Sequence, residues 1–160
     1  MTETFPTEEL LSMMKKISLE LSAQLELKLK TEDMSGVQVY FLAYILRHHK
    51  EGSCLTELCR EVGVSKPTLS VLVKKLREKG YLCFQENPGD IRRKKILPTA
   101  RLLDEGDEFL QKVSQMETEI YSIFSQKEKE SLGCLEQKLL SWLTRLEQEE
   151  SQNRQEVLLP

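Results

Sequence analysis

The chain has 160 residues, of which 31% are charged and 39% hydrophobic, and its formal net charge is −3. These values are typical of one folded domain, or of a small domain with helical extensions, rather than of a disordered chain. No stretch approaches the roughly 18 consecutive apolar residues of a membrane helix. The acidic N-terminus also lacks the basic start of a signal peptide, so we expect a cytoplasmic protein that does not enter a membrane.

The first predicted element is an amphipathic helix over residues 7–30. Its apolar side chains recur three or four positions apart, at Leu10, Met14, Ile17, Leu21, Leu25 and Leu29. A second helix is predicted over residues 37–49. It has so few polar side chains that we expect it to lie at the centre of the fold.

Shorter elements follow in the middle of the chain. The predicted order is a strand over residues 53–55, helices over 57–62 and 66–79, and strands over 81–86 and 92–97 around a turn at residues 87–90. Gly63 and Gly80 are placed to end the two helices. This order predicts a helix-turn-helix followed by a β-hairpin.

The helical period returns after Thr99. Apolar stripes over residues 102–124 and 132–146 predict long helices, whereas the residues after Leu146 lose the period. The expected fold is mainly α with a small β-hairpin, a winged helix-turn-helix flanked by long dimerisation helices. Its expected parts are an N-terminal dimerisation helix (1–34), a lobe with the helix-turn-helix and the hairpin (35–101), C-terminal dimerisation helices (102–148) and a frayed tail (149–160).

Charge is unevenly distributed along the chain. Residues 60–101 carry 11 Lys or Arg and 4 Asp or Glu, a local charge of +7, while the other residues together carry −10. The predicted helix-turn-helix and hairpin lie in this basic segment. We therefore expect an anion-binding face there, flanked by acidic helices.

The second helix of a helix-turn-helix lies in the major groove of DNA, with its first residues nearest the bases. The candidate DNA-contacting residues on this helix are Ser65, Lys66, Thr68, Ser70, Lys74 and Lys75. The alternative interpretation is an ordinary amphipathic helix with a solvated basic face.

The predicted turn of the hairpin introduces a second group of candidates, Asp90, Arg92, Arg93 and Lys94. Arginine presented by a turn suits the narrow, negatively charged minor groove of DNA. Asp90 would hold an arginine or cap the turn. The alternative is an edge strand that Lys and Arg protect from pairing with another chain.

The stretch from Leu55 to Thr99 resembles the MarR family of bacterial transcriptional regulators. The matching motifs are Ser65-Lys66-Pro67-Thr68 after a Gly-Val, Glu78-Lys79-Gly80-Tyr81 at the helix end, and Asp90-Ile91-Arg92 in the hairpin. The resemblance implies a homodimer, with the first and last helices intertwined across a two-fold axis. It also implies double-stranded DNA as the partner, with the hairpin as the wing.

Three positions depart from the family pattern. Val71 stands where an Arg is frequent, which removes one expected DNA contact, and Asn87 stands where Asp is usual. The run of residues 98–102 after the wing lacks the usual Gly. None of these departures is expected to break the fold.

The resemblance also implies a small lipophilic or aromatic effector. The pocket residues implied in this way are Tyr40, Tyr44, His48 and Trp142, the alternative being aromatic packing in a helical core. Some relatives sense peroxide through a cysteine in the first helix, but no cysteine precedes Cys54 here. We expect the four cysteines (Cys54, Cys59, Cys83 and Cys134), which form no C-x-x-C pair, to be reduced, partly buried structural thiols.

The expected function is that of a homodimeric, ligand-responsive repressor that binds a pseudo-palindromic operator. The rival hypothesis is a protein-interaction adaptor that retains a winged helix without specific DNA binding. The sequence offers no nucleophile–base pair, no phosphate-binding glycine loop and no metal-ligand spacing, so we expect neither an enzyme nor a cofactor or metal site.

Overall fold

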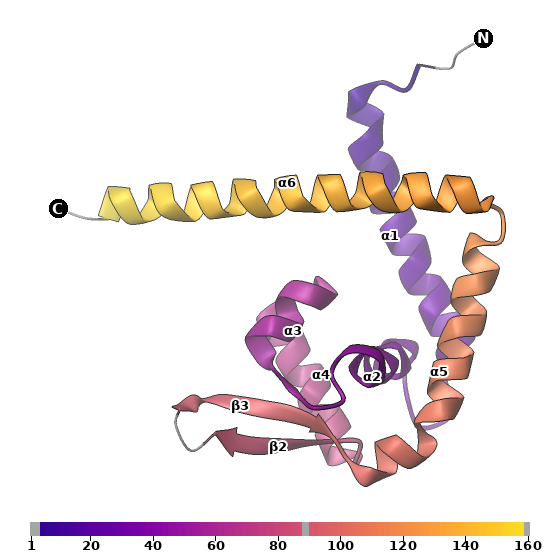
Figure 1. The fold of residues 1–160 in the computed structure, drawn as a ribbon, viewed down its shortest axis with the longest axis vertical. Coiled ribbons are helices and arrows are strands. Elements are labelled where there is room, and N and C mark those ends of the chain that lie inside the picture. The colour runs from indigo at the N-terminus through magenta and orange to yellow at the C-terminus, as the bar shows by residue number, and fades with distance from the viewer. Residues whose placement is uncertain (1–3, 88–89, 159–160) are drawn as a thin grey trace. The chain divides into compact units, whose positions relative to one another are not determined.

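The computed structural model describes residues 4–87 and 90–158; for residues 87 and 90–93 it describes the backbone alone. Figure 1 shows a mainly helical chain with one small sheet, which confirms the predicted fold class. Its elements are α1 (Thr7–Leu29), α2 (Gly36–His48), β1 (Ser53–Cys54), α3 (Leu55–Val62), α4 (Lys66–Glu78), β2 (Leu82–Asn87), β3 (Asp90–Pro98), α5 (Ala100–Tyr121) and α6 (Gln126–Leu158).

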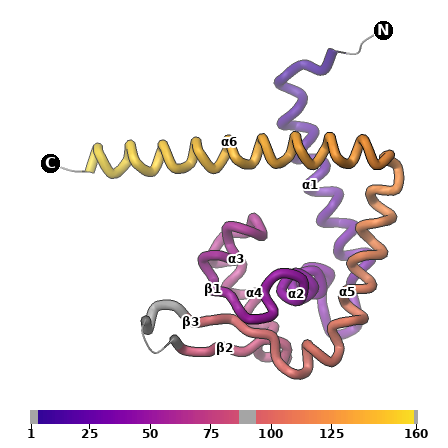
Figure 2. The backbone as a smooth tube through the Cα atoms, viewed as in Figure 1, coloured from indigo at the N-terminus to yellow at the C-terminus, as the bar shows by residue number. Residues whose placement is uncertain are grey.

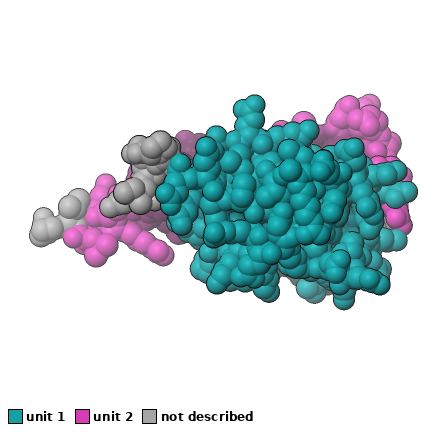
Figure 3. Space-filling model, turned by 90° about the horizontal axis from the view of Figure 1, so that it is seen from below, with its two compact units in different colours: residues 1–117 teal, residues 118–160 magenta. Residues whose placement is uncertain are grey.

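The chain forms two compact units, residues 1–117 and residues 118–160, which Figure 3 distinguishes by colour. The first unit contains α1 to α4, the sheet and most of α5. The second contains the end of α5 and all of α6. None of the helices within the described residues combines the length and apolarity needed to cross a membrane.

The sheet of the first unit is antiparallel, with the strand order β1-β3-β2. Strand β3 pairs on one side with β1, where Ser53 is opposite Ile96, and on the other with β2, where Phe84 is opposite the same Ile96. Ile96 is therefore the buried centre of the sheet, with 1% of its surface exposed. The β2–β3 hairpin extends beyond the helices of the lobe, as a wing does (Figure 2).

Helix α2 forms the centre of the lobe, as predicted from its sparse polar residues. Eight of its residues are buried, including Phe41, Leu42 and Ile45. Its start is fixed by a capping box, in which the Ser35 side chain accepts from the Gln38 N–H and the Gln38 side chain accepts from the Ser35 N–H. Such reciprocal capping pairs N–H groups that the helix itself leaves without partners.

Helices α1 and α2 cross at very short range. Both carboxylate oxygens of Glu26 accept from the Gly36 N–H, at 2.8 and 3.0 Å. A Cβ at Gly36 would lie 2.2 Å from the Leu25 carbonyl oxygen, so this position has no room for a side chain. Leu29, at the end of α1, is fully buried in the same region.

Helix α4 ends in the turn that Gly80 makes possible. Gly80 has φ of +85°, its N–H bonds to the Arg77 carbonyl, and the Tyr81 N–H bonds to the Leu76 carbonyl. This pair of bonds is the Schellman motif, in which glycine takes the left-handed position at no steric cost. The predicted helix end at Gly80 is therefore confirmed.

The C-terminal helix corrects one prediction. Residues 149–160 were expected to fray, but α6 continues through Leu158. The segment contains neither Gly nor Pro before residue 160 and is rich in Glu and Gln, which favour helix even without an apolar period.

The cysteines give a second correction. Cys54 and Cys59 are partly buried free thiols, as expected, but Cys83 and Cys134 are exposed. Cys83 lies on β2 and Cys134 on α6, where the sequence alone does not indicate which face is covered.

Candidate nucleic-acid interface

One face of α4 packs into the lobe and the other is open. Leu69, Val73 and Leu76 are buried on the inner face. The predicted contact residues on this helix are all exposed: Ser65, Lys66, Thr68, Ser70, Lys74 and Lys75. Hydroxyl and ammonium groups in this arrangement can donate hydrogen bonds to base edges and phosphates.

The start of α4 is held by its own hydroxyls. The Ser65 Oγ accepts from the Thr68 N–H at 3.4 Å and lies 2.8 Å from the Thr68 Oγ1, to which it donates. Pro67 occupies the first turn, where its missing N–H is not needed. The positive end of this helix therefore lies next to Lys66, a combination that attracts anions.

The wing and α4 meet around a cleft of about 490 Å³. Lys66 and Ser70 from α4 and Lys94 from β3 all line it. The Lys94 ammonium lies 5.8 Å from the centre of the Phe84 ring, and the Arg77 guanidinium lies 4.9 Å from it. The structure thus brings three predicted residues from two elements to one basic surface, with an aromatic ring that orients two cations.

The remaining wing residues are placed by their backbone only. Asp90, Arg92 and Arg93 lie in β3, and Asp90 pairs with Asn87 across the hairpin. Their side chains lie outside the described part of the chain. Their role on the DNA stays a prediction.

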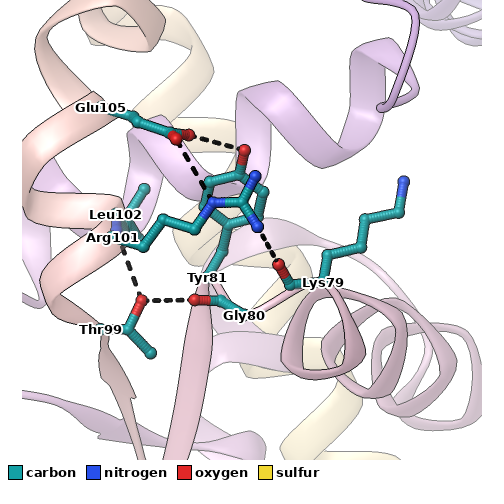
Figure 4. A network of polar contacts seen from close by, with 7 residues as sticks. All are labelled: Lys79, Gly80, Tyr81, Thr99, Arg101, Leu102 and Glu105. Atoms are coloured by element: carbon teal, nitrogen blue, oxygen red, sulfur yellow. Dashed lines mark hydrogen bonds and ion pairs between the residues drawn. The ribbon is translucent and has the colours of Figure 1, made fainter.

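Two other cations of the basic segment are directed at the protein. Lys79 donates through Nζ to the Asp33 carbonyl and, at 3.1 Å, to the Gln38 Oε1. Arg101 donates to the Lys79 carbonyl at 2.5 Å, as Figure 4 shows. The local charge of +7 therefore overstates the charge that is available to a ligand. The sequence analysis did not predict this network. Its one signal in the sequence was an aromatic residue, Tyr81, directly after Gly80 at the end of a helix.

Comparison with known proteins identifies this arrangement. The sequence model of the MarR family matches residues 32–93, which extend from the α1–α2 connection into the wing. The winged-helix lobe is therefore similar to the MarR family. This confirms the resemblance drawn from the sequence motifs; members of the family are winged-helix transcription regulators.

Solved structures extend the similarity beyond the lobe. The complex of S. aureus MepR with DNA is 26% identical, with a TM-score of 0.69, and the match covers 86% of this chain and 98% of that one. A MarR protein from Peptoclostridium difficile is 21% identical, with a TM-score of 0.73, and the match covers 89% and 92% of the two chains. BpsR of Bordetella bronchiseptica, whose DNA binding is regulated by 6-hydroxynicotinic acid, is 12% identical, with a TM-score of 0.70 and coverage of 82% and 98%. The last two similarities concern the fold alone, and among curated proteins there is no match.

Val71 is the position on α4 where the resemblance drawn from the sequence led us to expect an arginine. Its side chain is 54% exposed on α4, among the candidate contact residues. At this position the chain therefore presents an exposed apolar side chain instead of a cation.

The residues proposed for an effector pocket are only partly grouped. The Tyr44 and His48 rings lie 4.6 Å apart between centres, and the Tyr44 hydroxyl donates to Glu61 of α3 at 2.8 Å. Tyr40 lies one turn before Tyr44 on α2, whereas Trp142 lies on α6 in the second unit. A shared pocket for these residues stays a prediction.

Glu61 connects the ends of α2 and α3. Besides the Tyr44 hydroxyl, it contacts the Nε2 of His49 at 2.5 Å. The bond to His49, with that to Tyr44, holds the pKa of Glu61 below its ordinary value of 4.5. Burial, reinforced by the bond to Glu61, raises the pKa of Tyr44 to about 12. No group of three His, Cys, Asp or Glu suited to a metal ion occurs among the described residues, this cluster included.

Proposed function

We propose that this chain is a DNA-binding transcriptional regulator that inserts α4 into the major groove. The observation that carries the proposal is the exposed row on α4, from Ser65 to Lys75, joined to Lys94 at one cleft in a lobe similar to the MarR family. The major groove, about 12 Å wide, admits one helix. The similarity to MepR bound to DNA supports the same assignment.

Within this interface the side chains have different tasks. Lys66, Thr68 and Ser70 lie at the front of α4, where a recognition helix reaches base edges. Lys74 and Lys75 lie further along the helix, and together with Lys94 of the wing they meet phosphates. The remaining wing residues, Asp90, Arg92 and Arg93, extend the contact into the flanking minor groove.

The regulator acts as a homodimer on a pseudo-palindromic operator. Apolar side chains are exposed along one stripe of α6, at Leu139, Trp142, Leu143 and Leu146, and α1 exposes others, such as Leu10, Met14 and Ile17. Exposed apolar stripes of this kind indicate a protein interface. In a symmetric dimer the two α4 helices would read two half-sites.

The finer functional assignment is a cytoplasmic, ligand-responsive repressor. The regulation of BpsR by a small aromatic acid supports an effector of that class. The Tyr44 and His48 rings, which lie 4.6 Å apart and are tilted by 48° next to the α2–α3 connection, offer an aromatic surface for such a compound.

A protein-interaction adaptor is the second candidate, because the exposed Val71 and the acidic balance of the other elements weaken DNA binding. The experiment that separates the two begins with retardation of random duplex DNA at low salt. Selection of bound sequences from a random pool by the full-length protein follows. A regulator retards random duplex and enriches a two-fold related sequence, whereas an adaptor does neither.

A further inference from the structure

The turn at the end of α4 is held by the first turn of α5. The Thr99 Oγ1 donates to the Gly80 carbonyl at 2.6 Å and accepts from the Leu102 N–H at 3.3 Å, so one hydroxyl joins the turn to the start of α5 (Figure 4). The Thr99 N–H also bonds to the Tyr81 carbonyl, at 3.1 Å. The position of the turn therefore depends on α5.

Arg101 makes a further connection between the turn and α5. Its guanidinium donates to the Lys79 carbonyl at 2.5 Å and lies 4.3 Å from the centre of the Tyr81 ring. Its Nε pairs with Glu105 at 3.3 Å. The carbonyls at a helix C-terminus have no partner within the helix and carry partial negative charge, so a guanidinium there is favourable. One planar group thus joins the end of α4 to an aromatic ring and a carboxylate.

Tyr81 anchors the other side of the guanidinium. The side chain is 5% exposed, its ring meets Phe109 of α5 edge to face at 5.8 Å, and its hydroxyl donates to Glu105 at 2.7 Å. Burial, reinforced by Glu105, raises the pKa of Tyr81, so the phenol remains a donor at neutral pH. Glu105 therefore holds both Tyr81 and Arg101, and the three side chains form one closed set of contacts, which we call the clamp.

The same turn is held from the opposite side by Lys79. Its bonds to the Asp33 carbonyl and to Gln38 reach the segment before α2 and its capping box. These contacts hold the last turn of α4 between the segment before α2 and the first turn of α5.

We propose that Arg101 is a positioning residue for DNA recognition, which fixes the orientation of α4 relative to the wing without touching DNA. This inference rests on the proposed function. Helix α5 continues from Arg101 to Tyr121, past residue 117, where the first compact unit ends. The clamp therefore also connects α4 to the helix that enters the second unit.

The test compares three full-length variants with the wild type: Arg101→Gln, Arg101→Lys and Lys112→Gln. Lys112→Gln is the matched control, because it removes one positive charge from α5 at a residue whose ion pair within the described part of the chain runs along the same helix, to Glu108 at 3.9 Å. We expect Arg101→Gln to lower operator affinity roughly 2- to 30-fold, the range for residues that act on a site from outside it. The ratio of operator to random-DNA affinity should also fall, and the salt dependence should stay parallel to that of the wild type.

Arg101→Lys distinguishes geometry from charge. A lysine keeps the charge but cannot join the Lys79 carbonyl, the Tyr81 ring and Glu105 at once. Recovery of wild-type affinity by Arg101→Lys, or a flatter salt dependence in Arg101→Gln, would make Arg101 a phosphate contact and overturn the proposal. If the folded Arg101→Gln protein keeps the wild-type ratio of operator to random-DNA affinity, Arg101 only stabilises the fold and the proposal is overturned.

Hydrogen exchange supplies a measurement that needs no DNA. The amides of Gly80 and Tyr81, which bond to the carbonyls of Arg77 and Leu76, should exchange faster in Arg101→Gln than in Lys112→Gln. Equal exchange in the two variants overturns the clamp whether or not DNA binds. A wild-type protein that retains no DNA overturns the proposed function instead, and the exchange result still decides the clamp.

Discussion

At the scale of single residues, the exposed cations of α4 differ from those that hold the fold. Lys74 and Lys75 are exposed, whereas Lys79 donates to the Asp33 carbonyl and to Gln38. All three carry the same charge in the sequence. Only their partners separate a phosphate contact from a structural one, so composition alone could not assign them.

Lys75 provides the prediction that isolates the phosphate term. Each phosphate contact that is lost should reduce the slope of log affinity against log salt by about 0.9. We expect Lys75→Gln to weaken operator and random DNA equally and to flatten that slope. Fluorescence anisotropy titrations over a series of salt concentrations measure it, with Lys112→Gln as the control. A slope that stays at the wild-type value would remove Lys75 from the interface.

Glu61 leads to a prediction about pH. Its folded-state pKa lies below its ordinary 4.5, so its contribution to folding is complete above pH 4.5 and is lost as the pH falls through the folded-state value. Glu61 is partly exposed, which limits the effect to less than about 1 kcal/mol. Glu61→Gln should therefore lower the melting temperature slightly at pH 7 and progressively less below pH 4.5. Calorimetry over this range, with Asp104→Asn as a surface control, tests the account, and an effect of Glu61→Gln that grows in acid would refute it.

At the scale of elements, the order and type of the helices and strands followed from periodicity and turn residues. Gly63 and Gly80 end α3 and α4 as predicted. Both adopt a positive φ, which glycine favours, so a glycine in the sequence indicates where a helix can end. The start of α3 is different: the helix was predicted to begin at residue 57 but begins at Leu55, directly after β1. Pairing of β1 with β3 sets that start, and a pairing across the lobe has no local signature.

The crossing of α1 and α2 gives the element-scale prediction. Gly36→Ala should lower the free energy of unfolding by about 1–3 kcal/mol, because the new methyl group meets backbone atoms that cannot move aside. Gly133→Ala is the matched control, since it lies within α6 with open space around it. It should leave stability unchanged or raise it by about 0.5–1 kcal/mol. Urea unfolding measures both; similar values for the two variants would mean that the crossing is not tight.

At the scale of the whole molecule, the apolar period does not show how the chain divides into compact units. The boundary between the two units is at residue 117, inside α5, and the predicted dimerisation helices from residue 102 stay a prediction. Periodicity marks a helix but not which part of the helix packs on which unit. The candidate site could also be predicted only in part. Its α4 residues lie on one helix and followed from the sequence of that helix, whereas the clamp of Tyr81, Arg101 and Glu105 joins segments that are distant in the sequence.

Dimer formation is the prediction at this scale. Light scattering should give twice the chain mass of 18.6 kDa. Leu143→Lys places a charge in the exposed apolar stripe of α6 and should raise the dimer dissociation constant. Gln137→Lys adds the same charge on the opposite face of α6 and should not. A monomeric wild type, or equal behaviour of the two variants, would contradict the proposed interface.

The central claim is that the front of α4 reads DNA sequence. Ser70→Ala tests it more cleanly than Thr68→Ala, because the Thr68 hydroxyl also accepts from Ser65 at the helix cap. The measurement is the ratio of operator to random-DNA affinity for Ser70→Ala beside Lys75→Gln, at one salt concentration. We predict that Ser70→Ala lowers this ratio, by about 1–3 kcal/mol in discrimination if the lost contact is a good one, while Lys75→Gln leaves it unchanged. Full sequence preference in Ser70→Ala and in Thr68→Ala would contradict the account and assign the reading to the wing or to the shape of the DNA.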